Sequence, residues 1–98
     1  MQKLKIKQFR GEPKSGKTTA TCEEMKKIVR EDKGARVLVI SDDAAINSFA
    51  RHLSLQERRR ITVMIPGLSY DEPVDEQTMQ MIRSHGGHVL IDGNWLLP

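Results

Sequence analysis

The sequence has few of the residues on which several classes of protein depend. Among its 98 residues there is one cysteine, Cys22, and the aromatic residues are one Trp, one Tyr and two Phe. A single cysteine excludes an internal disulfide framework, and so few aromatic rings argue against a surface that stacks several bases. There is no signal-peptide pattern and no apolar run of membrane length, so we expect a cytoplasmic protein without a membrane partner.

Length and charge set further bounds on the fold and on the partners. A chain of 98 residues is large enough to bury one core, so we expect a single domain over residues 1–98. Sixteen Lys and Arg against thirteen Asp and Glu give a formal net charge of +3. This mild excess of positive charge is compatible with a polyanionic partner and does not require one.

One segment carries a specific chemical signal. Residues 11–18 read GEPKSGKT and match the pattern G-x-x-x-x-G-K-S/T without a mismatch. Residues 4–9 before it are extended in pattern, and residues 18–33 after it have apolar side chains at helical spacing. A strand, a turn and a helix in this order are the context that a phosphate-binding loop requires. The sequence therefore predicts nucleotide binding.

Each part of this loop has a chemical role. The glycines let successive backbone N–H groups point into one concavity, and the start of the helix adds the positive end of its dipole. Lys17 would reach the β- and γ-phosphates, Thr18 would offer its hydroxyl to Mg²⁺, and Lys14 would add a second positive charge at the rim. The predicted nucleotide-binding residues are Gly11, Glu12, Pro13, Lys14, Ser15, Gly16, Lys17, Thr18 and Thr19.

A second motif supplies an acid. Residues 88–92 read HVLID, an apolar run that predicts a buried parallel strand with Asp92 at the carboxyl edge of the sheet. Asp92 is the candidate partner of Thr18 on Mg²⁺, with ATP or another nucleoside triphosphate as the ligand. An ordinary turn after a buried strand is the alternative explanation for Asp92.

Strands and helices alternate between these two motifs. Residues 37–40 predict a central strand and residues 61–65 a further one. Helical patterns cover residues 44–60, with apolar positions at Ala45, Ile46, Phe49 and Leu53 and a capping box from Ser54 to Glu57, and a third helix starts near Asp75 and ends at Gly86. We expect an α/β fold with three layers, α/β/α, and a four-stranded, mostly parallel sheet.

On these segments the chain resembles P-loop NTPases. It is most similar to the first half of the ATP-binding core of superfamily 1 helicases, through the loop with its second threonine, Thr19, through residues 37–53 and through residues 89–92. Thymidine kinases, which share the Ser-Gly-Lys-Thr-Thr loop and a similar second strand, are the second resemblance. The resemblance to P-loop NTPases implies a truncated P-loop NTPase core that binds Mg²⁺ and ATP. In the helicase arrangement a strand separates the Asp92 strand from residues 4–9, whereas direct pairing indicates the kinase type.

One position departs from the helicase pattern. Helicases of this group follow the metal aspartate with a glutamate that orients the attacking water, and this sequence has Gly93 there. A glutamate at position 93 would, in a helicase-like geometry, face the γ-phosphate. The catalytic residue is otherwise unknown, and the candidate acids are Glu12, Asp42 and Asp43, unless a second chain supplies the base.

Three functions stay open on these grounds. They are a Mg²⁺-dependent ATP-binding domain with weak or partner-dependent hydrolysis, a nucleotide-gated interaction module without turnover, and a small-molecule kinase. A protein partner or a second copy of the chain would complete the sheet and the site. Alternating Lys3, Lys5 and Lys7, with the run 58–60 of arginines, raise nucleic acid as a partner, while an edge strand with one solvated face explains the lysines as well.

Overall fold

The computed structural model describes residues 5–11, 16–41, 44–66 and 73–97. The elements in these ranges are β1 (Lys5–Phe9), α1 (Lys17–Glu31), β2 (Val37–Ser41), the 3₁₀ helix η1 (Ala44–His52), α2 (Leu55–Arg59), β3 (Ile61–Met64), α3 (Glu76–His85) and β4 (His88–Asp92). No helix of the described ranges is both long enough and apolar enough to cross a bilayer.

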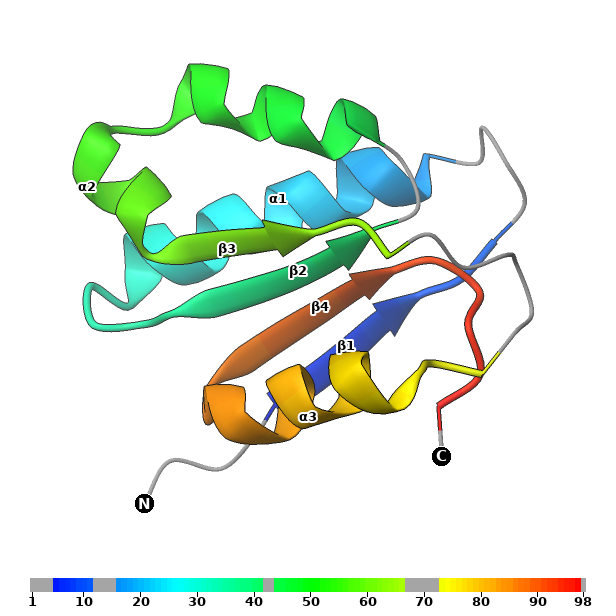
Figure 1. Ribbon diagram of the computed structural model, residues 1–98. Helices are drawn as coiled ribbons and strands as arrows, with labels where there is room; N and C mark the ends of the chain where they lie inside the picture. The colour runs from blue at the N-terminus through cyan, green and yellow to red at the C-terminus, as the bar shows by residue number, and fades with distance from the viewer. Residues whose placement is uncertain (1–4, 12–15, 42–43, 67–72, 98) are drawn as a thin grey trace.

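The four strands form one parallel sheet in the order β1-β4-β2-β3 (Figure 1). Every residue of β2 is buried, as the apolar run predicts for a central strand covered on both faces. The α/β class and the parallel sheet are therefore confirmed. β1 pairs directly with β4, with Phe9 opposite Asp92, so among the described strands none separates the two, and the helicase-type gap that the resemblance allowed is not present.

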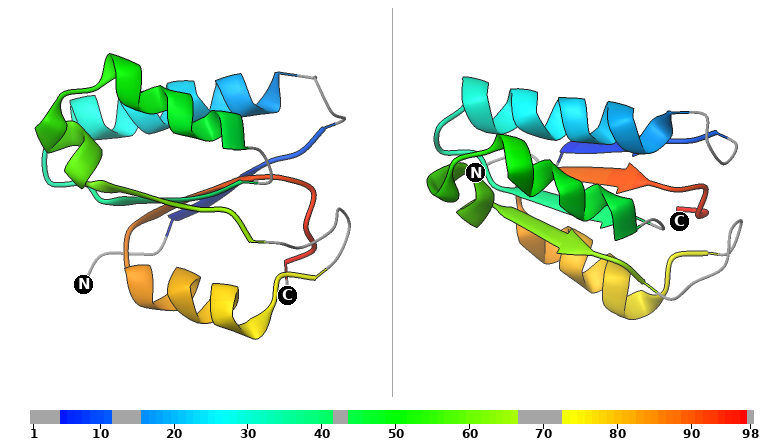
Figure 2. Two further views of the ribbon diagram at one scale, coloured as in Figure 1. Left: turned by 45° about the horizontal axis from the view of Figure 1, so that its top comes forward. Right: turned by 90° about the horizontal axis from the view of Figure 1, so that it is seen from above.

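Helices cover both faces of the sheet. Figure 2 shows α1 and η1 on one face and α3 on the other. Side chains alternate along each strand: Leu90 packs with the apolar residues of α1, whereas Val89 and Ile91 pack with Ile82 of α3. By the same alternation Asp92 projects toward the α1 face and position 93 toward the α3 face.

The helix ends follow the local sequence signals. In α2 the predicted capping box is formed, because Ser54 Oγ accepts from the Glu57 N–H at 3.2 Å and Glu57 Oε1 accepts from the Ser54 N–H at 2.8 Å. Asp75 caps α3 by accepting from the Thr78 N–H at 2.8 Å. Gly86 ends α3 in the left-handed region, with φ of 69°, a conformation that glycine adopts without strain.

The segment after β2 differs from the prediction. It forms a 3₁₀ helix over Ala44–His52 rather than an α-helix. A 3₁₀ helix rises about 2.0 Å per residue, so nine residues extend roughly as far as one strand of the sheet, and the chain returns to the amino end where α2 begins. Ile46 and Leu53 are buried as predicted; the side chains of Ala45 and Phe49 lie outside the description.

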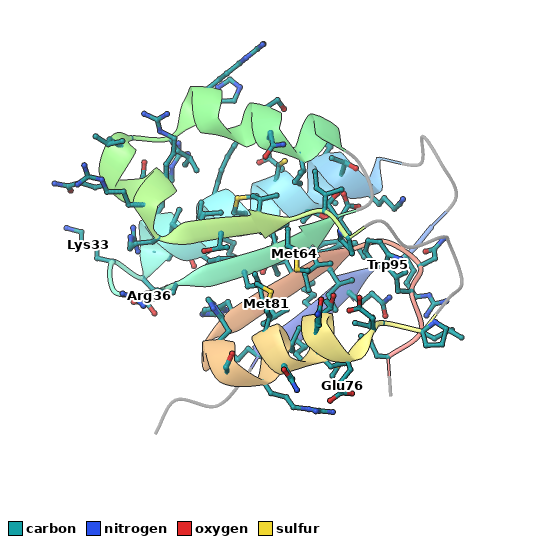
Figure 3. The ribbon with its side chains drawn as sticks, viewed as in Figure 1. Lys33, Arg36, Met64, Glu76, Met81 and Trp95 are labelled. Atoms are coloured by element: carbon teal, nitrogen blue, oxygen red, sulfur yellow. The ribbon has the colours of Figure 1, made fainter. Side chains whose placement is uncertain are left out.

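The segment after β4 closes the α3 side of the core. Trp95 is 1% exposed and packs with Leu38, Ile40 and Ile82. Figure 3 shows it at the carboxyl end of the sheet, opposite the end at which Lys33 and Arg36 lie. The Val74 N–H donates to the Leu96 carbonyl at 3.0 Å, which ties this segment to the chain entering α3.

Candidate functional site

The fold brings Thr18, Ser41 and Asp92 together at the carboxyl edge of the sheet. Asp92 ends β4 with Phe9 of β1 on one side and Ser41 of β2 on the other. Thr18 belongs to the first turn of α1, which lies over the face toward which Asp92 projects. The predicted proximity of Thr18 and Asp92 is confirmed, because the two side chains are hydrogen-bonded.

Two hydroxyl groups donate hydrogen bonds to the same carboxylate oxygen of Asp92. Thr18 Oγ1 donates to Asp92 Oδ2 at 2.8 Å, and Ser41 Oγ donates to it at 2.8 Å. Asp92 has no exposed surface, and its other oxygen, Oδ1, has no hydrogen-bond partner within the described part of the chain. A buried acceptor without a partner costs about 1–3 kcal/mol. Oδ1 is therefore a position at which a cation or a water would be stabilising.

The donor set around Asp92 fits Mg²⁺. A hydroxyl has one proton and two acceptor lone pairs, so Thr18 keeps lone pairs for a cation while it donates to Asp92. Mg²⁺ is usually held by one or two carboxylates together with waters and phosphate oxygens. The atoms that would coordinate Mg²⁺ are Asp92 Oδ1 and Thr18 Oγ1. In the described ranges no three His, Cys, Asp or Glu residues gather as a metal cluster.

The start of α1 has the features of an anion site. Gly16 precedes the helix with φ of 87°, a left-handed conformation that glycine tolerates best. No acidic residue lies in the first turn of this 15-residue helix, so its positive end is not neutralised from within. Lys17, the first helical residue, is buried, with 9% of its surface exposed. The start of α1 and the Thr18 hydroxyl thus adjoin Asp92, and Lys17 directly precedes Thr18 in the chain.

Several predicted residues lie beyond what the structure describes. Thr19 is exposed on α1, and Gly11 is half-buried at the end of the first described range. The predicted loop residues Glu12, Pro13, Lys14 and Ser15 and the candidate acids Asp42 and Asp43 lie outside the described residues. The catalytic candidates therefore stay predictions.

Three residues that sequence reasoning did not single out take part in the site. Ser41 binds Asp92, as described above. Asn94 Oδ1 accepts from the Gly11 N–H at 3.0 Å, and Asn94 Nδ2 donates to the Gly11 carbonyl at 2.8 Å. Gln8 Nε2 donates to the carbonyls of Gly93 and Trp95, at 2.9 and 2.8 Å. A signal existed for Ser41: it directly follows an apolar run, as Asp92 does, and so ends its strand at the same edge.

Position 93 does not face the site. A Cβ built on Gly93 would lie 2.6 Å from Cζ3 and 2.8 Å from Cε3 of Trp95, which is on the α3 side of the sheet. The expectation that a glutamate at this position would face the γ-phosphate is therefore wrong. The physical reason is the alternation of side chains along β4, which sends residues 92 and 93 to opposite faces.

The basic residues predicted as a nucleic-acid surface come from opposite edges of the described sheet, and Lys3 lies outside the described residues. Lys5 and Lys7 lie on β1, at one edge of the described sheet, and Lys7 Nζ lies 3.6 Å from Glu24 Oε2. Arg60 precedes β3 at the other edge, and its guanidinium donates to the carbonyls of Val29 and Asp32 at 2.6 and 2.7 Å. Arg60 thus holds the end of α1.

A pocket of about 450 Å³ lies near Arg60 and α2, and Val29, Arg30, Lys33 and Glu57 contribute to its lining. Two of its charged groups pair with each other: Arg30 Nε lies 3.7 Å from Glu57 Oε2. Lys33 is at the end of the molecule opposite Trp95 (Figure 3). The lining of the pocket includes none of the hydrogen-bonded residues Thr18, Ser41 and Asp92.

Cys22 lies one helical turn after Thr18 and is half-buried. Burial raises the pKa of its thiol, Lys26 opposes this effect, and the negative charges of Asp92 and Glu23 add to it. The thiol is therefore held in its neutral form, which is the weaker nucleophile.

Comparisons with protein-family models, with curated proteins and with solved structures find no match to this chain. The class is thus defined by the fold itself, an α/β domain with a four-stranded parallel sheet and helices on both faces.

Proposed function

We propose that this chain binds a nucleoside triphosphate together with Mg²⁺, with ATP as the first ligand to test, and hydrolyses it weakly or only with a partner. The observation that carries the proposal is the hydrogen bond between Thr18 and Asp92. It joins the helix that starts at the phosphate-loop motif to the strand that ends in an acid. The unpartnered Oδ1 of Asp92 lies in the same buried cluster.

Each residue has a role in this proposal. Backbone N–H groups at the start of α1 and the Lys17 ammonium bind phosphate oxygens. Thr18 and Asp92 hold Mg²⁺, which, when bound, neutralises phosphate charge and orients the phosphate chain. Ser41 fixes the Asp92 carboxylate by donating to Oδ2, so that Oδ1 is the oxygen left for the ion.

Weak turnover follows from the residue after Asp92. A positioned acid that activates water contributes about 10²–10⁴-fold to such reactions, and the position at which the helicase resemblance would place it is Gly93, packed against Trp95. The base would have to come from Glu12, Asp42, Asp43 or a second chain. Without one of these the chain is a nucleotide-gated interaction module.

A small-molecule kinase is the second candidate. The direct pairing of β1 with β4 favours it, since this is the strand arrangement that the thymidine kinase resemblance implies. In that case the γ-phosphate would pass to a hydroxyl acceptor rather than to water. Incubation with labelled ATP and a set of nucleosides, thymidine included, distinguishes the two, because phosphorylated nucleoside forms only in the kinase.

Calorimetric titration of ATP, GTP and ADP, each with Mg²⁺ and with EDTA, tests the proposal when it is run beside a phosphate-release assay. We expect binding that Mg²⁺ strengthens and slow release of phosphate. Binding with no release selects the interaction module, and no binding of any of the three nucleotides contradicts the proposal.

Asp92→Asn identifies the metal role within the same experiment. It should remove the Mg²⁺-dependent part of the affinity and leave the affinity in EDTA. Asp32→Asn is the matched control, because Asp32 Oδ1 accepts only a local bond from the Gly34 N–H in an exposed turn. If neither EDTA nor Asp92→Asn changes the affinity, Asp92 holds no metal ion and has a structural role only.

A further inference from the structure

Asn94 makes a contact that neither the phosphate-loop motif nor the metal site explains. Its amide binds both polar groups of the Gly11 backbone: Oδ1 accepts from the N–H at 3.0 Å and Nδ2 donates to the carbonyl at 2.8 Å. The two residues are 83 positions apart in sequence. Gly11 is the first residue of the motif, so a single side chain fixes the point at which the loop leaves β1.

The segment that carries Asn94 is itself held firmly. The Gly93 N–H donates to the Phe9 carbonyl at 3.2 Å, and Gln8 Nε2 donates to the Gly93 and Trp95 carbonyls. Trp95, next along the chain, is buried in the core on the α3 side. Asn94 is two residues from Asp92, so one short segment carries the acid and also binds Gly11.

The choice of residue fits this contact. Only an amide side chain offers a donor and an acceptor side by side in the way that a backbone N–H and C=O require. An aspartate in this place could still accept from the Gly11 N–H, but it would set an acceptor against the Gly11 carbonyl. Asn94 lies outside β4, which ends at Asp92.

We propose that Asn94 is a positioning residue that fixes Gly11, the first residue of the motif, relative to Asp92, and so couples the binding of phosphate to the binding of Mg²⁺. This rests on the proposed function, because the coupling exists only if the site binds a nucleotide and the ion. When the first residue of the motif is already held, less conformational freedom is lost on binding.

The test measures ATP affinity with Mg²⁺ and with EDTA for the wild type, Asn94→Ala and Asn94→Asp. The control is Asn47→Ala, since Asn47 is exposed on η1. The decisive quantity is the affinity with Mg²⁺ divided by the affinity with EDTA for the same variant. A loss of folded protein lowers both affinities equally and so does not change this ratio. We expect Asn94→Ala and Asn94→Asp each to reduce this ratio on the order of tenfold, as for the loss of one or two hydrogen bonds, and Asn47→Ala to leave it unchanged.

Amide hydrogen exchange at Gly11 supplies a readout that needs no ligand, and it should become faster in Asn94→Ala. An unchanged ratio in Asn94→Ala overturns the inference even if binding becomes weaker, because weaker binding alone would be a stability effect. If that variant does not fold, Asn94→Asp, which keeps the shape and one of the bonds, decides in the same way. A wild type that does not bind ATP contradicts the proposed function itself, whereas wild-type binding with unchanged variant ratios overturns only the role of Asn94.

Discussion

Gly93 lies against the indole of Trp95 so closely that a Cβ at position 93 would stand 2.6 Å from Cζ3 and 2.8 Å from Cε3. Trp95 is 1% exposed and packs with the apolar residues of the α3-side cluster. A side chain at the residue after Asp92 would therefore require the Trp95 indole to shift, so packing disfavours an acid at this position.

We predict that Gly93→Ala destabilises the fold by about 1–3 kcal/mol, as overpacking of a filled core typically does. Urea unfolding measures the change. Gly34→Ala is the matched control, because a Cβ there meets only Asp32 Oδ1, at 3.7 Å, and should change the stability by less than about 0.5 kcal/mol. Equal unfolding midpoints for the two variants would show that Trp95 does not restrict position 93.

Ser41→Ala should lower the free energy of unfolding by about 1–3 kcal/mol, because it removes a donor from a buried carboxylate that already has one unpartnered oxygen. The control is Ser84→Ala: Ser84 is exposed on α3 and its Oγ donates to the Met81 carbonyl at 3.2 Å. Urea unfolding of both variants makes the comparison. A Ser41→Ala protein as stable as Ser84→Ala would mean that the Ser41 hydroxyl contributes nothing to holding Asp92.

Cys22 gives a prediction on pH. Burial raises the pKa of its thiol, so in the folded protein alkylation by iodoacetamide should be slower than in the urea-unfolded chain at the same pH, and the ratio of the two rates should be largest at pH values below the usual thiol pKa of about 8.5. Because the pKa is raised on folding, the associated stability is fully present below the unfolded pKa and is lost as the pH rises through the folded pKa. Equal alkylation rates in the two states would contradict the burial of this thiol.

The sequence was most informative where chemistry and local pattern coincide. The phosphate-loop spacing and the apolar run that ends in Asp92 together predicted that Thr18 and Asp92 are close. The capping residues Ser54 and Asp75 predicted where α2 and α3 begin, since a cap depends on residues only three positions away.

The sequence did not predict which strands pair or which side chains make contacts at the strand ends. The sequence allowed β4 either beside β1 or one strand away, because apolar runs show that a strand is buried but not which strand it pairs with. Asn94 and Gln8 carry no motif, and their roles arise from contacts with residues more than 80 positions away. The 3₁₀ winding of η1 was also missed, since the helical patterns of the two types are similar over nine residues.

The central claim is that the segment starting at Gly16 and Lys17 binds the phosphates of a nucleotide. Its most direct test is calorimetric titration of ATP with Mg²⁺ into three proteins: the wild type, Lys17→Ala and Lys27→Ala, a control that removes an exposed lysine from the same helix. Circular dichroism first establishes that all three are folded. We predict one site in the wild type and in Lys27→Ala, with about 10- to 150-fold weaker binding in Lys17→Ala, as for the loss of one hydrogen bond to a charged group. Equal binding by all three proteins, or no binding by the wild type, would contradict the account.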